Sequence, residues 1–256
     1  MLQAIDHLAV VTRDLDTAIA GYRALGFTVM PGGRHARASH NALVAFADGA
    51  YLELIAYWED GRAHRWWPPL QKGGGLVDFC LGTDNLDADL AAFRRAGVTM
   101  EDRSPGGRVR PDGYQLRWSS CAPARDQQGV APFIIEDGTP RAERVPRETT
   151  HANGVTGVGV VTVAVDDVAR AAGWYAGPLG RPGEPVKRED LGAAGLRFRI
   201  GPHALELLAP VAPGAGPLAE WLARRGPSPY AATLLGGTPK GPLDPARAQG
   251  ARFVFV

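Results

Sequence analysis

Two residues in the first quarter of the sequence, His7 and Glu53, have side chains of the kind that bind divalent transition metals. Each lies in an apolar run, where an unpaired carboxylate or imidazole is costly to bury. An imidazole nitrogen with a carboxylate oxygen suits Mn, Fe, Ni, Co or Zn, and open coordination positions allow the ion to polarise a substrate oxygen. The alternative is structural: His7 forms a hydrogen bond in the core and Glu53 pairs with an arginine such as Arg117. The residue types alone leave both alternatives open.

The elements that must position these residues recur along the chain. A shift of 153 residues carries Tyr22 onto Tyr175 and the segment 52–56 onto 205–209. A helix position and a distant strand that move together indicate that whole modules were copied, with a period too long for a solenoid. A shift of 71 residues superposes Thr12 on Thr83, Leu15 on Leu86, Asp16 on Asp87, Ile19 on Leu90, Tyr22 on Phe93 and Gly26 on Gly97.

The first copy has the pattern of a strand, a helix and three further strands. Residues 4–12 are apolar and rich in β-branched types, and Asp14 stands where a helix cap belongs. Apolar residues then follow at helical spacing as far as Gly26. The remaining strands are predicted at 27–30, 41–47 and 51–57, with a turn at 31–33.

The later copies repeat this order less completely. Residues 139–153 are charged and lack an apolar period, which predicts a linker. Residues 250–256 resemble 26–30, so the fourth copy is expected to end before its last two strands. The second copy is predicted to have a helix at 86–96, strands at 76–83, near 98, at 114–120 and at 132–136, and insertions at 105–107 and 123–129. The third copy runs from 155 to 209, followed by a helix at 218–225 and a strand at 230–235.

Composition favours a soluble globular protein with a small partner. The 28 basic residues nearly balance the 27 acidic ones, so the basic surface typical of a nucleic-acid binder is not expected. No apolar stretch has membrane-spanning length and no signal segment is seen, which makes the cytoplasm the expected location. Cys80 and Cys121 lie in apolar strand-like runs and are expected to be reduced core thiols.

Several segments resemble the glyoxalase-like branch of the vicinal oxygen chelate superfamily. The resemblance covers about residues 4–140 strongly and the remainder weakly. The segments that carry it are Ile5-Asp6-His7-Leu8, Pro31-Gly32-Gly33-Arg34-His35, His40-Asn41-Ala42-Leu43-Val44, Tyr51-Leu52-Glu53-Leu54-Ile55, Arg110-Pro111-Asp112-Gly113, Leu116-Arg117-Trp118 and Pro132-Phe133-Ile134-Ile135-Glu136.

The resemblance implies an α+β fold in which repeated βαβββ modules form half-open β barrels flanked by helices. Such proteins include isomerases, lyases, epimerases, dioxygenases and antibiotic-binding proteins, so the fold leaves the reaction open. The implied organisation is a domain at 1–140 with modules at about 4–58 and 76–137, a linker at 141–154, and a second region at 155–256 with a full module (155–210) and a truncated one (218–256).

The resemblance also implies a divalent metal between two modules, with His7 and Glu53 as ligands. The shift of 71 residues places Asp78 opposite His7, and Glu136 stands where the second module's last glutamate is expected. Both are candidate ligands, and Glu136 is also a candidate base. Because three carboxylates would more than neutralise a divalent ion, His40 is the reserve ligand or general base. The ion would be Fe, Mn, Ni, Co or Zn, and a metal-free cavity stays an alternative.

Substrate contacts are predicted from Asn41, Arg117, Trp118 and Trp66. Arg117 and Trp118 can recognise a carboxylate or a ring, although strand alternation points them to opposite sides. Trp66 belongs, with Trp58 and Trp67, to an aromatic cluster that forms a lid or packs the junction between modules. The other histidines are expected in loops or turns that face solvent: His35, His64, His151 and His203.

The third copy keeps a glutamate, Glu206, but places Val160 opposite His7, so no second metal centre is expected. Glu206 is expected to pair with Arg197 or Arg199. The sequence therefore predicts a glyoxalase-like protein with one divalent metal, acting on a small oxygenated organic substrate by lyase, isomerase or dioxygenase chemistry. The alternative is a metal-free protein that binds or sequesters a small molecule such as an antibiotic. A homodimer is compatible with both.

Overall fold

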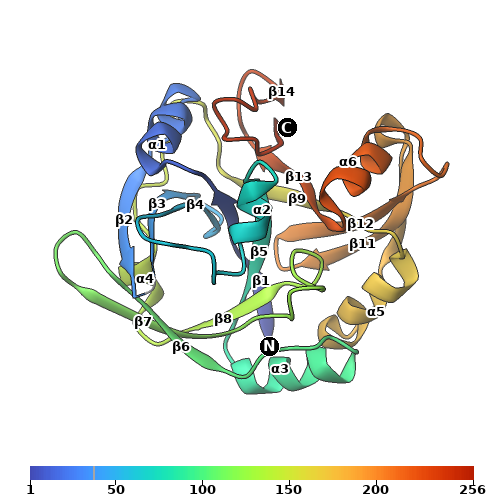
Figure 1. Ribbon diagram of the computed structural model, residues 1–256, viewed down its shortest axis with the longest axis horizontal. Coiled ribbons are helices and arrows are strands. Elements are labelled where there is room, and N and C mark those ends of the chain that lie inside the picture. Colours follow the sequence, from blue (N-terminus) through green and yellow to red (C-terminus); the bar gives the residue numbers. More distant parts are fainter. Residues whose placement is uncertain (37) are drawn as a thin grey trace.

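The repeated modules form two curved sheets that contact each other through β1 and β5 of the first and β11 and β13 of the second (Figure 1). The structure is a computed structural model that describes residues 1–36 and 38–256. The observed architecture is the predicted α+β fold of βαβββ modules, and the first sheet closes into a complete barrel.

The barrel has the strand order β1-β4-β3-β2-β6-β7-β8-β5. In each module the last strand lies parallel to the first, β4 to β1 and β8 to β5. The antiparallel pairs β1 with β5 and β2 with β6 join the two modules and close the barrel. The strands are β1 (Leu2–Val11), β2 (Met30–His35), β3 (Ser39–Ala45), β4 (Tyr51–Tyr57), β5 (Gly75–Thr83), β6 (Ser104–Val109), β7 (Gln115–Cys121) and β8 (Phe133–Asp137).

The second sheet has seven strands in the order β10-β11-β12-β9-β13-β15-β14. Its first module has the full pattern, with β12 parallel to β9. The strands are β9 (Gly157–Ala164), β10 (Glu184–Arg188), β11 (Ala193–Ile200), β12 (His203–Pro210), β13 (Ser228–Leu235), β14 (Gly241–Pro242) and β15 (Phe253–Phe255).

The prediction for the fourth copy was wrong. β15 lies parallel to β13 and antiparallel to β14, so it takes the place of a module's last strand. The described chain from β13 to β14 contains no helix, so this copy lacks its helix and second strand and keeps its last two.

Three of the helices begin with the same capping device. Asp14, Asn85 and Asp167 each accept a hydrogen bond from the backbone N–H three residues ahead, which satisfies a donor left open at the helix start. The helices are α1 (Leu15–Ala24), α2 (Trp67–Gln71), α3 (Leu86–Arg95), α4 (Arg141–Arg144), α5 (Val168–Leu179), α6 (Pro217–Arg225) and the 3₁₀ turn η1 (Glu189–Leu191).

The side chains of β1 point alternately to the apolar core and to the barrel interior. Leu8 and Val10 point outward into one large apolar core, which also contains Val161 and Leu205 of the second sheet. His7 and Ala9 point inward, because successive side chains of a strand face opposite sides. The barrel interior is therefore the side on which the polar residues gather.

The segment Pro31-Gly32-Gly33, predicted as a turn, is part of strand β2. A Cβ atom on Gly32 would lie 2.0 Å from Asn41 Oδ1, and one on Gly33 would lie 2.0 Å from the Val109 carbonyl oxygen. The glycines are therefore required by the close approach of neighbouring strands, not by a turn. Pro105-Gly106-Gly107 lies likewise within β6 and is not an insertion.

The charged segment 141–154 is more ordered than a simple linker. It begins with α4, and its residues Arg144, His151 and Asn153 are buried against the rest of the protein. The charge that suggested solvent exposure serves buried ion pairs. The exact domain boundaries stay a prediction.

Two further observations concern the chain as a whole. Cys80 and Cys121 are buried free thiols, as predicted. Among the helices of residues 1–36 and 38–256, none combines the length and apolar character needed to span a membrane.

Candidate functional site

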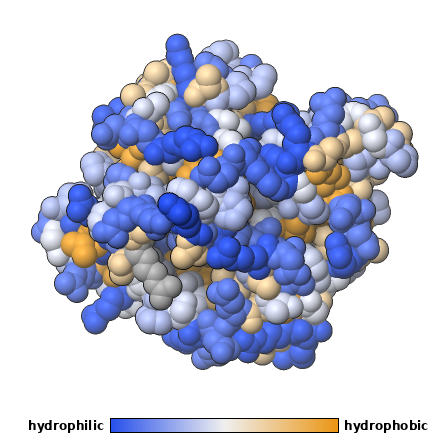
Figure 2. All heavy atoms as spheres, in the orientation of Figure 1, coloured by the Kyte–Doolittle hydropathy of each residue, from blue (hydrophilic) through white to orange (hydrophobic). Residues whose placement is uncertain are grey.

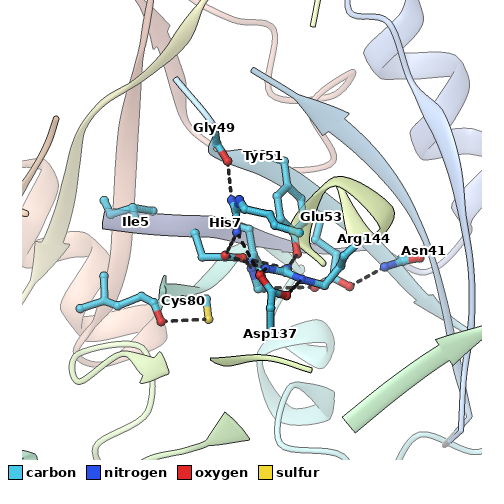
Figure 3. A network of polar contacts seen from close by, with 12 residues as sticks. Ile5, His7, Asn41, Gly49, Tyr51, Glu53, Cys80, Asp137 and Arg144 are labelled. Atoms are coloured by element: carbon cyan, nitrogen blue, oxygen red, sulfur yellow. Dashed lines mark hydrogen bonds and ion pairs between the residues drawn. The ribbon is translucent and has the colours of Figure 1, made fainter. Parts of the chain in front are cut away.

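His7 and Glu53 meet inside the barrel. The parallel pairing of β1 with β4 sets Ala9 beside Glu53, and the Nε2 atom of His7 lies 3.5 Å from Glu53 Oε2. Both side chains are buried, with 4% and 9% of their surface exposed. The His7 ring stacks on Tyr51 with a centroid separation of 4.7 Å. Figure 3 shows Tyr51, Glu53 and Arg144 grouped around His7.

The other nitrogen of His7 is held by Asp6. The distance from His7 Nδ1 to Asp6 Oδ1 is 2.7 Å, and Arg144 binds both Asp6 oxygens at 3.0 and 2.8 Å. Burial by itself raises the pKa of Asp6, but Arg144 and His7 outweigh it and hold that pKa well below its usual range. Asp6 is therefore a carboxylate that accepts the Nδ1 proton, which leaves Nε2 as the nitrogen that faces Glu53.

His35, expected in a solvent-facing loop, is a third member of this group. It lies at the end of β2, with Nε2 3.5 Å from Glu53 Oε1 and Nδ1 3.0 Å from Ser39 Oγ. Burial lowers the pKa of His35 and favours the neutral imidazole, although the charge of Glu53 acts in the opposite direction. The two imidazoles thus face different oxygens of one carboxylate.

Asn41 and Arg108 orient that carboxylate. Asn41 Nδ2 donates to Glu53 Oε1 at 2.6 Å, and Arg108 donates to Asn41 Oδ1 at 3.2 Å. Burial works to raise the pKa of Glu53, but His7, His35 and Asn41 together lower it below its ordinary value. Asn41, predicted to contact substrate, therefore lies at the site as a partner of Glu53.

Asp78 lies inside the barrel but is not free to bind a metal. Its register with Ala9 places it on the interior face. Arg65 and the indole of Trp66 donate to Asp78 Oδ2 at 2.7 and 2.8 Å, and the Phe79 backbone N–H donates to Oδ1 at 3.0 Å. Burial raises the pKa of Asp78 in spite of these donors. Hydrogen bonds from the protein thus occupy both carboxylate oxygens of Asp78, which had been predicted to bind the metal.

Glu136 does not occupy the position in the second module that Glu53 occupies in the first. That position lies three residues earlier in the chain. Ala9 pairs with Glu53 across β1 and β4, and the matching residue Cys80 pairs with Phe133 across β5 and β8. The second module therefore has Phe133 where the first has Glu53. Glu136 points out of the barrel and pairs with Arg103 at 3.0 Å. It reaches neither His7 nor Glu53, so the predicted roles as ligand and base are both without support.

His40 and Arg117 also point away from the site. Because Asn41 faces the interior, its neighbour His40 faces outward, toward Arg34 and the start of α1. Arg117 is exposed on the outer face of β7. The imidazole that joins His7 beside Glu53 is that of His35 and not that of His40. Arg117 and Trp118 point to opposite sides of their strand, as predicted.

Two predicted aromatic contacts do lie at the site. Trp118 meets His35 edge-on with a centroid separation of 6.1 Å. Trp66 is 5% exposed and packs edge-on against Phe133, at 5.8 Å, inside the barrel. Trp67 packs on Tyr57, whereas Trp58 is exposed and stacks under Arg34. Trp66 and Trp67 therefore share one apolar cluster, and Trp58 lies apart from it.

Among the described residues, Asp6, His7 and Cys80 are the one group of three whose potential ligand atoms all lie within 4.8 Å of one another; His7, His35 and Glu53 do not meet this limit. Burial raises the pKa of the Cys80 thiol well above its usual value, so it stays protonated. Asp6 is already bound by Arg144 and Arg141. The protonated thiol and the two arginines on Asp6 therefore make this group poorly suited to a metal.

The second half contains no equivalent histidine pair. Glu206 is fully buried, as is expected of a copied Glu53, and binds Arg197 at 3.0 Å and Arg188 at 3.2 Å. His203 was expected to face solvent but is buried; it accepts from the Ile5 N–H and contacts Asp48. His151 is buried as well, where it bonds the backbone of Thr28 and Ala45. These two histidines join the halves of the protein.

Comparison with known proteins agrees with this architecture. The sequence model of the glyoxalase-like domain family matches residues 5–179, and the protein belongs to this family. The predicted membership of the glyoxalase-like branch of the vicinal oxygen chelate superfamily is thereby confirmed. No curated protein sequence matches the chain.

Solved structures share the fold at low identity. A hypothetical protein from Staphylococcus aureus is similar over 100% of this chain and 99% of its own, with a TM-score of 0.72 and 12% identity. A mutant of 4-hydroxymandelate synthase from Streptomyces coelicolor is similar over 92% of this chain and 71% of its own, with a TM-score of 0.64 and 15% identity. At these identities the likeness shows the fold alone.

Proposed function

We propose that the barrel holds one divalent metal on His7, His35 and Glu53 and that the protein is an enzyme acting on a small oxygenated organic molecule. The observation that carries this proposal is the position of the two Nε2 atoms, each 3.5 Å from a different oxygen of Glu53. Because His7 Nδ1 donates its hydrogen bond to the Asp6 carboxylate, the Nε2 atom of His7 faces the Glu53 carboxylate. Two such acceptors repel each other unless a proton or a cation lies between them.

The donor set suits the ions predicted from the sequence. Two imidazoles and one carboxylate are a common ligand set of Fe(II) oxygenases, and Mn, Co, Ni and Zn accept the same donors. The carboxylate of Asp6 behind His7 and the amide of Asn41 behind Glu53 are the kind of outer partners that orient metal ligands. A metal bound there would supply Lewis-acid polarisation of a substrate oxygen.

The interior also offers donors to a substrate. Arg108 Nε and Arg65 Nε are buried and have no hydrogen-bond partner within the described chain. A buried unsatisfied guanidinium N–H is costly, and a substrate carboxylate or enolate oxygen would satisfy it. Trp66 and Phe133 supply apolar walls. We infer a small, flat, oxygenated anion as the substrate of a lyase, isomerase or dioxygenase reaction.

A metal-free binding protein is the second candidate, and one observation favours it. The second module has Asp78 and Phe133 where the first has His7 and Glu53, so two of the four positions that a metal would use are lost. In this alternative His7 and Glu53 are structural residues, and the barrel holds a drug-like ligand without an ion.

Elemental analysis separates the two candidates. Protein purified without an affinity tag is compared with its His7→Ala and Glu53→Gln variants, with His40→Ala as a matched histidine control. One metal per chain in the parent and in His40→Ala, lost in the other two, is expected of the enzyme. No metal in the parent, with small-molecule binding unchanged by Glu53→Gln, would support the binding protein instead.

A further inference from the structure

The second half of the protein contains an open hollow of about 600 Å³ to which the sequence analysis assigned no role. It lies on the concave side of the second sheet, between β13, β15 and α6. Thr162 on its floor takes the place of Ala9, because Thr162 pairs with Glu206 as Ala9 pairs with Glu53. The hollow therefore corresponds to the barrel interior of the first half.

This hollow is strongly cationic. Five of its lining side chains are basic and one, Asp190, is acidic; the basic ones are Lys72, Arg188, Arg224, Arg225 and Arg252. Asp190 is bound by Arg188, whose Nε and Nη2 atoms donate to it at 2.9 and 2.6 Å. Among the described residues, the other four basic side chains have no acidic partner within ion-pair distance. Lys72 and Arg225 donate hydrogen bonds to backbone carbonyl oxygens. Four positive charges thus line one cavity without a carboxylate to neutralise them.

The arginines surround an aromatic pair. The guanidinium carbons of Arg224, Arg225 and Arg252 lie 6.0, 4.7 and 5.3 Å from the ring centroid of Trp221. Trp221 meets Tyr230 edge-on, and Arg252 donates to the Tyr230 hydroxyl at 2.8 Å. Burial, together with the charges of Arg224 and Arg252, lowers the pKa of Arg225. Figure 2 shows hydrophilic side chains gathered over α6 beside an apolar patch.

Mutual repulsion of the arginines disfavours this arrangement in the empty protein, and an anion would relieve it. Guanidinium groups bind carboxylate and phosphate oxygens with two parallel hydrogen bonds. The apolar part of the lining, which includes Leu191, Leu243 and Phe253, suits a flat apolar body beside the charged group. We propose that this hollow is a binding site for a small organic anion with a flat apolar part, separate from the barrel site and independent of its metal.

Four probes test this proposal by isothermal titration calorimetry on the full chain. Phenyl phosphate and benzoate carry both features, benzyl alcohol lacks the charge, and inorganic phosphate lacks the ring. Saturable one-to-one binding of phenyl phosphate or benzoate, at least about tenfold tighter than that of the other two probes, is expected. Equal binding of benzyl alcohol, or binding of none of the four probes, would overturn the proposal. If inorganic phosphate bound as tightly as phenyl phosphate, the proposal that the site recognises a flat apolar group would be wrong.

Variants locate the binding. Arg252→Gln and Arg224→Gln should each weaken phenyl phosphate binding at least about tenfold, because each removes a charged donor from the hollow. Arg199→Gln removes an exposed charge of the same sheet that pairs with Glu184 and does not line the hollow, and it should leave the affinity unchanged. Loss of affinity equal in all three variants would show general attraction to a basic protein and contradict the site. Loss in His7→Ala but not in Arg252→Gln would place the binding in the barrel instead.

Discussion

His35 and Arg188 occupy the same position in their modules, and each contacts the buried glutamate of its own module. They are 153 residues apart, and the pairing of β2 with β3 matches that of β10 with β11 at this position. His35 Nε2 lies 3.5 Å from Glu53, and Arg188 Nη1 lies 3.2 Å from Glu206. The duplicated module thus satisfies its glutamate with imidazoles in one half and with arginines in the other.

This relationship predicts the effect of His35→Arg. The substitution gives the first barrel the arginine of the second, so the guanidinium should pair with Glu53 and exclude a cation. We expect a folded protein with a circular dichroism spectrum like that of the parent and less than one tenth of its metal content. Retention of the full metal content in a folded His35→Arg protein would show that His35 is not a ligand.

Asp6 is predicted to stabilise both the fold and the site. Asp6→Asn takes one carboxylate from Arg144, of which 3% is exposed and which keeps its pair with Asp137, so the free energy of unfolding should fall by about 1–3 kcal/mol. Because His7 also loses its outer partner, metal affinity should fall about 10–100-fold. Urea unfolding and metal titration measure the two effects. Asp112→Asn, which breaks an exposed pair with Arg110, is the control and should change neither.

The pH dependence of Asp6 has a definite sign. Its pKa in the folded protein lies well below the unfolded value, so its contribution to stability is complete above about pH 4 and is lost as the pH falls below that. The difference in unfolding free energy between the parent and Asp6→Asn should therefore shrink from pH 5 to pH 3. A difference that stays constant over this range would contradict the ionised Asp6.

Asp78 and Glu136 are predicted to be dispensable for metal binding. Asp78→Asn and Glu136→Gln should retain one metal per chain, because protein donors hold Asp78 and Glu136 faces outward. Asp78→Asn should still lower the unfolding free energy, by about 1–3 kcal/mol, since Arg65 and Trp66 lose a charged acceptor. Elemental analysis decides, and loss of metal in Glu136→Gln would restore the four-ligand arrangement expected from the sequence.

The lowered pKa of His64 predicts a loss of stability in weak acid. Burial, with help from Arg65, lowers the pKa of His64 to about 4, against about 6.5 in the unfolded chain. Below pH 6.5 the unfolded chain takes up a proton at His64 that the folded protein does not, so the free energy of unfolding falls as the pH falls toward 4. The expected decrease between pH 7.5 and pH 5 is about 2 kcal/mol. Urea unfolding of chelator-treated protein at these two pH values should show a smaller loss for His64→Gln than for the parent. An equal loss would mean that His64 is protonated in the fold.

Much of the fold was predictable because its signals are local and repeated. The caps Asp14, Asn85 and Asp167, the apolar alternation and the shifts of 71 and 153 residues all lie in the sequence itself. The sequence does not show that Asn41 and Val109 closely approach Gly32 and Gly33. The segment 31–33 was therefore predicted as a turn, although it is a strand. The parallel pairing of β15 with β13, which shows that the fourth copy lacks its helix, also depends on residues far apart in the sequence.

The site was predictable only in part for the same reason. The sequence indicated that His7 and Glu53 share one space, and the structure brings them together. His35 was missed because the mistaken turn at 31–33 placed it in a loop. Glu136 was chosen because an uncertain number of inserted residues hid the register that puts Phe133 opposite Cys80. Arg108 and Arg144 could not be found, since their partners lie 67 and 138 residues away.

Titration of the chelator-treated full chain with Co²⁺, followed by calorimetry and visible absorption, tests the central claim most directly. We predict one saturable site per chain in the parent and in His40→Ala, and none in His35→Ala or Glu53→Gln. A parent that binds no Co²⁺, or a His35→Ala protein that titrates like the parent, would contradict the account.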